Sequence, residues 1–230
     1  MNFFETVESV FHDWRYDHPR ILYSLIRAMK PSVAVEVGTY RGYAACYMAR
    51  ALQENNNGHL YCIDNLSLTD HLARYGTDPV THWGNNLTAT GVRDWATLIV
   101  GKSDEVIWPA KIDFAYIDGW HSYQTCLHDF TRAAYAGASC ICLDDIVQSV
   151  GPRMVFDLIR KTDEWQVLEL FHDCGMGICV RKTPKPPYTF SQELPDNPGV
   201  DLRPLSRQER IEHFAEASKT TGLDYSEFCQ

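Results

Sequence analysis

The sequence lacks any apolar run long enough to cross a bilayer, and its first residues do not form a signal-peptide pattern. The opening segment, MNFFETVESVFHDW, carries acidic groups where a secretory signal would be basic and then apolar. A surplus of positive charge is also missing, since 21 Lys and Arg face 30 Asp and Glu, for a formal net charge of −9. Such a surface repels nucleic-acid phosphate. We therefore expect a soluble, cytoplasmic protein that does not act on nucleic acid.

Cysteine is present, but not in a pattern that binds zinc or builds a disulfide framework. None of the eight cysteines forms a C-x-x-C pair, and most lie inside apolar runs. Cys140 and Cys142 fall two apart in one predicted strand, so both side chains are expected on the same face. We interpret the cysteines as small buried side chains of a protein in a reducing compartment.

Strand and helix patterns alternate along the chain from residue 33 onward. Because strands that alternate with helices build a parallel sheet covered on both faces, we predict an α/β, doubly wound, mostly parallel, Rossmann-like sheet. WQVLELF and MGICVRK read as a closing antiparallel hairpin, which brings the count to seven strands. The five earlier strands are predicted at 33–37, 59–63, 96–100, 112–117 and 139–143, and helices at 41–54, from Ser122 and near 152–161.

Three parts of the chain are expected. Residues 1–30 read as two N-terminal helices, at 3–14 and 19–30, and residues 31–182 as the main domain. Residues 183–230 read as a proline-rich extended arm and a last helix that begins with a capping box at Ser206. This tail is interpreted as a lid or as an arm that joins copies of the chain in a homo-oligomer. The 65–95 segment is polar and predicted to be irregular, with one helix near 81–90.

Small and acidic residues follow the first three predicted strands. In VEVGTYRGY, Gly38 permits a tight turn and Gly42 allows the next helix to begin close to a ligand. Asp64 ends the second strand, where a carboxylate can accept hydrogen bonds from both ribose hydroxyls. Ser103 follows the third strand, where its hydroxyl can face an adenine. Together these features predict a nucleotide-type cofactor, and the missing G-x-G-x-x-G disfavours a nicotinamide.

Over residues 33–182 the sequence resembles class I S-adenosylmethionine (SAM)-dependent methyltransferases of the catechol O-methyltransferase group. The resemblance rests on AVEVGTYRGYAACYMARAL, on YCID and on GKS. It implies SAM as the cofactor, with Glu36, Gly38 and Tyr40 at its methionine end, Asp64 at the ribose, and Ser103 and Trp120 at the adenine. The complete set implied to bind the cofactor is Glu36, Gly38, Thr39, Tyr40, Gly42, Asp64, Asn65, Ser103, Asp118 and Trp120.

Acidic residues also end the fourth and fifth predicted strands. Asp118 lies in YIDGWH, and Asp144 and Asp145 lie in LDD. Paired strands lie about 4.8 Å apart, so Asp118 and Asp144 are expected to converge. Three carboxylates at one place repel each other unless a proton or a cation lies between them. Oxygen ligands of this kind favour Mg²⁺, Mn²⁺ or Ca²⁺, and such an ion lowers the pKa of a bound hydroxyl.

His121 follows Asp118 by three residues and is predicted to be the general base that takes a proton from an acceptor hydroxyl. The catechol group has a lysine base at this place. The pattern of Asp118, His121 and the pair Asp144-Asp145 is more similar to metal-dependent sugar and macrolide O-methyltransferases, which often begin the acidic pair with glutamate. The resemblance implies O-methylation of a small hydroxylated molecule, either a sugar-bearing natural product or a phenol.

Alternatives stay open at this point. They are a metal-independent methyltransferase, methylation at nitrogen, a protein similar to cephalosporin hydroxylases with the same fold and an acidic metal site, and an inactive SAM-binding scaffold. The 65–95 segment, with His82 and Trp83, is either one wall of the acceptor pocket or a surface excursion. Arg153 is expected to be solvated, with an acidic substrate group as its alternative partner.

Overall fold

The computed structural model describes residues 2–13, 16–67 and 71–183, together with positions 208, 209, 212, 215, 216 and 219. Seven strands form one sheet, and their hydrogen-bonded order is β3-β2-β1-β4-β5-β7-β6. The predicted fold class is therefore confirmed. The strands are β1 Val33–Val37, β2 His59–Asp64, β3 Ala96–Val100, β4 Phe114–Ile117, β5 Cys140–Leu143, β6 Trp165–Leu170 and β7 Met176–Arg181.

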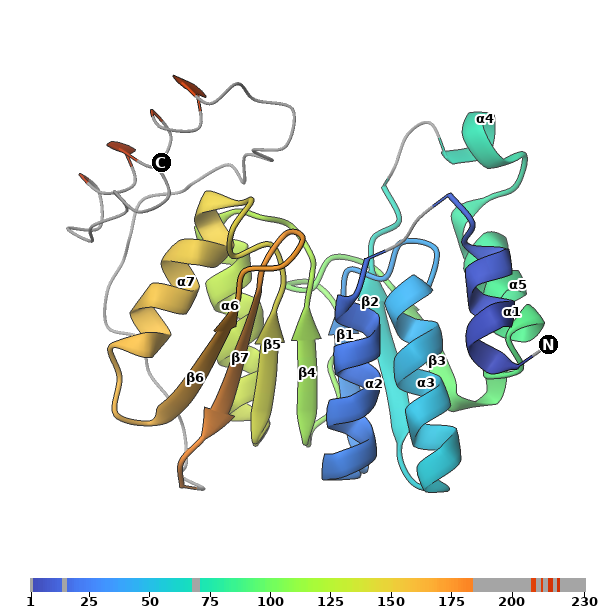
Figure 1. The fold of residues 1–230 in the computed structure, drawn as a ribbon, viewed down its shortest axis with the longest axis horizontal. Coiled ribbons are helices and arrows are strands. Elements are labelled where there is room, and N and C mark those ends of the chain that lie inside the picture. The colour runs from blue at the N-terminus through green and yellow to red at the C-terminus, as the bar shows by residue number, and fades with distance from the viewer. Residues whose placement is uncertain are drawn as a thin grey trace. The chain divides into compact units, whose positions relative to one another are not determined.

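The helices follow the sequence pattern except in two regions. The first helix ends at Val10 rather than at residue 14. The 65–95 segment, predicted to be irregular with one helix, contains two α-helices and a 3₁₀ turn. The helices are α1 Phe3–Val10, α2 His18–Met29, α3 Tyr43–Asn55, α4 His71–Tyr75, α5 Pro79–Ala89, η1 Arg93–Trp95, α6 Tyr123–Tyr135 and α7 Val150–Arg160 (Figure 1).

Helix α5 has a start signal that explains why it forms. The side chain of Asp78 accepts a hydrogen bond from the backbone N–H of Thr81, and Pro79 occupies the first turn, where its missing N–H is not needed. Trp83 and Leu87 lie on one face of this helix and are fully buried. The polar composition of 65–95 thus concealed an amphipathic helix.

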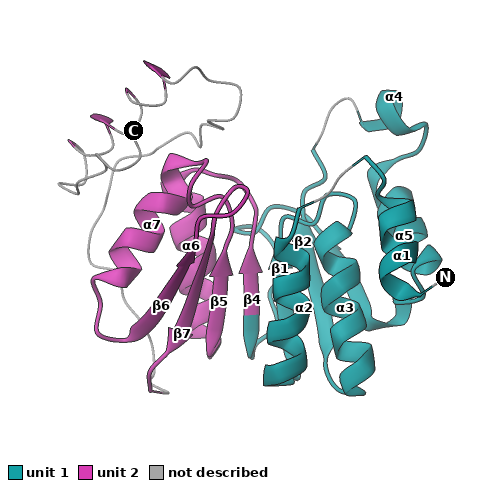
Figure 2. Ribbon diagram, viewed as in Figure 1, with its two compact units in different colours: residues 1–114 teal, residues 115–230 magenta. Residues whose placement is uncertain are grey.

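The chain divides into two compact units, residues 1–114 and residues 115–230 (Figure 2). The three-part division expected from the sequence stays a prediction, and its arm and last helix over 183–230 fall almost entirely outside the described residues. Among the described residues, no helix has the length and apolar character that a bilayer crossing needs. Seven cysteines in this part of the chain are buried thiols outside any disulfide, as predicted.

In residues 1–114, three parallel strands carry buried apolar side chains toward the helices. Val33 of β1 lies opposite His59 of β2, and Leu60 of β2 lies opposite Ala96 of β3. Helices α2 and α3 pack side by side (Figure 1). Nearly every side chain from Tyr43 to Leu52 is buried, so α3 is a core helix rather than a surface one.

In residues 115–183, β5 pairs antiparallel with β7, and β7 forms the predicted hairpin with β6. Helix α7 approaches this hairpin closely, because a Cβ atom at Gly177 would lie 2.4 Å from the Phe156 ring. Arg153 of α7 was expected to be solvated, and this expectation is wrong. Its side chain is fully buried and makes two hydrogen bonds to Asp157, at 2.8 and 3.0 Å, and an ion pair with Glu169.

Replacing Arg153 with Met is expected to lower the free energy of unfolding by about 3–5 kcal/mol. The reason is that Asp157 and Glu169 lose the buried positive charge that pairs with them. Urea unfolding measures the effect. Arg160→Met is the matched control, since Arg160 contacts the same Asp157 and Glu169 but its side chain is 47% exposed. The control is expected to cost less than about 1 kcal/mol. Equal losses in the two variants would contradict a special role for the buried arginine.

Candidate functional site

The connection between β1 and α3 is a turn with three left-handed residues. Gly38 has φ 81°, Tyr40 has φ 48° and Gly42 has φ 86°. Glycine adopts such angles without steric cost, whereas tyrosine is held there by its surroundings. A Cβ atom at Gly42 would also lie 2.7 Å from Leu87 Cδ1, so this glycine is required by close packing as well as by backbone angle.

Asp64 holds this turn in place. Its Oδ2 accepts the backbone N–H groups of Thr39 and Tyr40, both at 2.8 Å, and its Oδ1 accepts the N–H of Leu66 at 2.7 Å. A carboxylate has about four lone-pair positions, so acceptor capacity remains. Asp64 therefore anchors the turn, and its binding of a ribose stays a prediction. The neighbouring Asn65 is exposed and accepts the N–H of Ser67.

Glu36 presents an unusual buried carboxyl group near the end of β1. Its side chain is 1% exposed, and neither carboxyl oxygen receives a hydrogen bond of ordinary length and angle. Burial raises the pKa of Glu36 from its ordinary 4.5 to about 7. Weak hydrogen bonding from the side chains of Thr39 and Cys62 opposes this rise, and the negative charge of Asp64 adds to it. A buried group left in this state points to a ligand rather than to folding, because such groups are costly.

Helices α4 and α5 contact the same turn from the 65–95 segment. Trp83 Nε1 donates to Thr39 Oγ1 at 3.0 Å, and Asn86 Nδ2 donates to the Arg41 carbonyl at 3.0 Å. The Tyr75 and Tyr40 hydroxyls lie 2.9 Å apart. The sequence interpretation did not assign these contacts, although the Asp78-Pro79 start of α5 was a usable signal. The segment therefore supports the turn, and its role as an acceptor wall stays a prediction.

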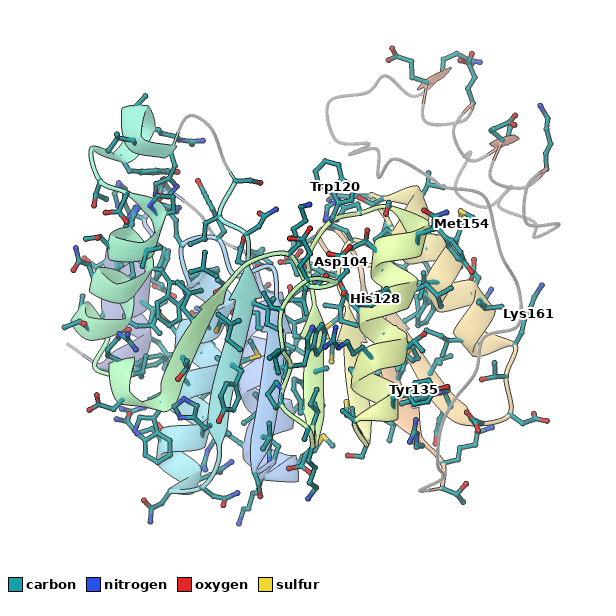
Figure 3. The ribbon with its side chains drawn as sticks, turned by 180° about the vertical axis from the view of Figure 1, so that it is seen from behind. Asp104, Trp120, His128, Tyr135, Met154 and Lys161 are labelled. Carbon is teal, nitrogen blue, oxygen red and sulfur yellow. The ribbon has the colours of Figure 1, made fainter. Side chains whose placement is uncertain are left out.

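The two residues predicted at the adenine differ in exposure. Ser103 is buried, and its carbonyl accepts a hydrogen bond from Trp108 Nε1 at 2.8 Å. Trp120 is 68% exposed. Figure 3 shows its ring projecting away from the ribbon. An exposed indole has a face available for stacking, so the predicted role of Trp120 is compatible with its position but untested.

The acidic residues that end β4 and β5 lie near a common hydroxyl group. The Tyr116 hydroxyl lies 2.6 Å from Asp144 Oδ2 and 3.3 Å from Asp118 Oδ2. Asp144 also receives a contact from the Cys174 thiol, with 3.4 Å between Sγ and Oδ1. Burial and the charges of nearby aspartates raise the pKa of Cys174, so this thiol stays protonated and donates to Asp144.

A second grouping brings His121 to the acidic residues. His121 Nε2 lies 2.8 Å from Asp145 Oδ2, and Asp145 has a left-handed backbone with φ 59°. One ligand atom from each of Asp118, His121 and Asp145 falls within 4.8 Å of the others. Of the predicted metal ligands, Asp118 and Asp145 therefore share this cluster with His121, while Asp144 bonds to Tyr116 and Cys174.

Comparison with known proteins finds a family that resembles part of this chain. Residues 35–146 match the family model described as a methyltransferase domain. The match covers 112 of the 230 residues, so the chain is similar to methyltransferases over just under half of its length. The matched segment includes the left-handed turn, Asp64 and all three aspartates of the acidic region. No curated protein gives a significant match to the sequence.

Solved methyltransferases share the fold at low sequence identity. The O-methyltransferase TomG from Streptomyces achromogenes, solved in complex with SAM, is 16% identical, with 79% of this chain and 89% of that chain covered and a TM-score of 0.58. An O-methyltransferase from Bacillus cereus is 19% identical, with 77% and 91% covered and a TM-score of 0.57. A methyltransferase from Podospora anserina is 12% identical, with 79% and 88% covered and a TM-score of 0.59.

The raised pKa of Glu36 predicts how the stability of the protein responds to pH. Between about pH 4.5 and 7 the folded state holds a proton on Glu36 that the unfolded state has released, so rising pH removes stability. Glu36→Gln does not titrate. We therefore expect the free energy of unfolding of Glu36→Gln, minus that of the wild type, to increase by about 2–3 kcal/mol from pH 5 to pH 8. Urea unfolding at each pH measures this difference.

Glu54→Gln is the control for this experiment. Tyr23, Arg50 and Arg27 lower the pKa of Glu54 against the opposing effect of burial, so its stability contribution changes only below its ordinary pKa of 4.5. The stability difference between this variant and the wild type should stay constant from pH 5 to 8. A constant difference for Glu36→Gln as well would contradict a raised pKa at Glu36.

Proposed function

We propose that the chain is a SAM-dependent O-methyltransferase that acts on a small hydroxylated molecule and uses a divalent metal ion. The observation that carries this proposal is the cluster of Asp118, His121 and Asp145, because it combines carboxylates that suit a metal ion with an imidazole that suits proton transfer. The match to the methyltransferase family model and the structural likeness to O-methyltransferases support the reaction class.

The residues proposed to hold SAM fit its charged groups. Glu36 offers two buried carboxyl oxygens that receive no hydrogen bond of ordinary length and angle, and they can accept hydrogen bonds from the ammonium group of the methionine part. Asp64 has acceptor capacity left for ribose hydroxyls. SAM, when bound, supplies the methyl group from its sulfonium sulfur. The proposed set remains Glu36, Gly38, Thr39, Tyr40, Gly42, Asp64, Asn65, Ser103, Asp118 and Trp120.

The residues proposed to hold the metal are Asp118 and Asp145, and Asp144, which shares the Tyr116 hydroxyl with Asp118, completes the predicted acidic set. Asp144 and Asp145 are 4% and 5% exposed, so their charges are largely removed from water and favour a cation nearby. Mg²⁺ is the first candidate, and Mn²⁺ or Ca²⁺ are alternatives. Such an ion supplies a lowered pKa for an acceptor hydroxyl bound to it.

His121 is proposed to take the proton of that hydroxyl. Asp145 is an acceptor for the proton on Nε2 and thereby stabilises the charged imidazolium once it forms. General base catalysis of this kind typically contributes about 10²–10⁴-fold in rate. The acceptor is proposed to be a sugar-bearing natural product or a phenol, because these carry the hydroxyl groups that the chemistry needs.

Asp118→Asn and Asp145→Asn are expected to abolish the Mg²⁺ isotherm and to lower turnover by at least about 10²-fold. Asp145→Asn should bind SAM as the wild type does, because Asp145 lies outside the proposed SAM set. Asp118→Asn should bind SAM more weakly but still measurably, because the other nine proposed contacts remain. Calorimetry measures binding, and tritium transfer from labelled SAM into a panel of phenols and sugar-bearing compounds measures turnover. Asp163→Asn changes an exposed aspartate and should match the wild type.

Each alternative predicts a different result. Turnover that survives both substitutions and EDTA would contradict the metal and leave a metal-independent methyltransferase. SAM binding without turnover on any acceptor, even with Mg²⁺ present, would favour the inactive scaffold. Label recovered on nitrogen rather than oxygen would overturn O-methylation alone.

A further inference from the structure

The hydroxyl of Ser149 is diverted from the role that its position usually gives to serine. Ser149 is the N-cap of α7, but its side chain makes no capping hydrogen bond. Ser122, the N-cap of α6, makes the usual bond, because its Oγ accepts the N–H of Thr125 at 3.1 Å. Two buried serines in the same local position therefore use their hydroxyl groups differently.

The Ser149 hydroxyl bonds instead to His121. Its Oγ lies 3.0 Å from His121 Nδ1. The serine is only 1% exposed, and its backbone is fixed at both ends, since its N–H donates to the Asp145 carbonyl at 2.8 Å and its carbonyl accepts the N–H of Arg153 at 3.2 Å. A partner held this firmly restricts the orientation of the imidazole ring.

A glycine two residues later allows this contact. A Cβ atom at Gly151 would lie 2.1 Å from the His121 carbonyl oxygen and 2.7 Å from the Tyr123 backbone nitrogen. Its φ lies outside the left-handed region, so close approach rather than backbone angle requires glycine here. The first turn of α7 therefore lies directly against the backbone that carries His121.

The two ring nitrogens of His121 have partners of different chemical character. An ionised Asp145 only accepts, so the neutral ring must carry its proton on Nε2 to satisfy the 2.8 Å contact, and Nδ1 then accepts from Ser149. A ring that is ready to take a proton at Nε2 must carry its own proton on Nδ1. The Ser149 hydroxyl fits that state too, because it accepts as readily as it donates.

We propose that Ser149 is a positioning residue for His121, whose hydroxyl holds the imidazole ring in its observed orientation. The proposal rests on the proposed function, in which His121 is the base. A carboxylate at this place would fix one tautomer, and an apolar side chain would remove the 3.0 Å contact with Nδ1. Serine alone among these keeps the ring in place while its proton changes position.

The test is the ¹⁵N spectrum of histidine-labelled full-length protein at about pH 8, above the ordinary imidazole pKa, without added metal. The His121 signals are those missing in His121→Gln. Wild-type protein should show Nε2 protonated and Nδ1 as a hydrogen-bonded acceptor. In Ser149→Ala the Nδ1 signal should move to the position of an acceptor that receives no hydrogen bond, and kcat should fall about 10–100-fold with little change in KM for SAM.

Ser122→Ala is the matched control, because it removes another buried N-cap hydroxyl one residue from His121. This variant should lose stability but keep the His121 spectrum of the wild type. If Ser149→Ala also keeps that spectrum, the positioning role is overturned. The spectrum does not depend on turnover, so an inactive wild type would contradict the proposed function without deciding this test.

Discussion

The hydrogen bonds that Asp64 accepts from the turn after β1 are the contacts on which the rest of the candidate site in residues 1–114 depends. A turn with left-handed Gly38, Tyr40 and Gly42 exposes backbone N–H groups, and Asp64 satisfies those of Thr39 and Tyr40 with one oxygen. The same turn places Thr39 against Trp83 and Gly42 against Leu87. One carboxylate thereby fixes the shape of the loop and the packing of α5 upon it.

Buried carboxyl groups occur in both compact units. Some are paired with a buried cation of the protein, and others are not. Asp157 and Glu169 are compensated by the buried Arg153, which makes them a structural ion-pair network. Glu36 has no such partner, and Asp144 and Asp145 are stabilised by a hydroxyl, a thiol and an imidazole rather than by a permanent cation. The uncompensated groups are those at the proposed SAM and metal sites, where a cationic ligand would complete them.

Much of this arrangement was predictable from the sequence, because strand ends and turns have strong local signals. β-branched runs marked the strands, and glycine and aspartate at their ends marked the turn, Asp64 and the meeting of Asp118 with Asp144. Side-chain direction was not predictable. Arg153 was expected to be solvated because the sequence does not show which residues it contacts. Asp157 lies one turn later in the same helix, and Glu169 lies in strand β6. The link from Ser149 to His121 spans 28 positions and leaves no local pattern.

Calorimetric titration of the purified protein with SAM tests the central claim, that this protein uses the turn after β1 to bind SAM. The account predicts a single saturable isotherm in the micromolar range, which weakens when Glu36 is replaced by Gln. A folded protein that gives no heat of SAM binding, with or without Mg²⁺, would contradict it.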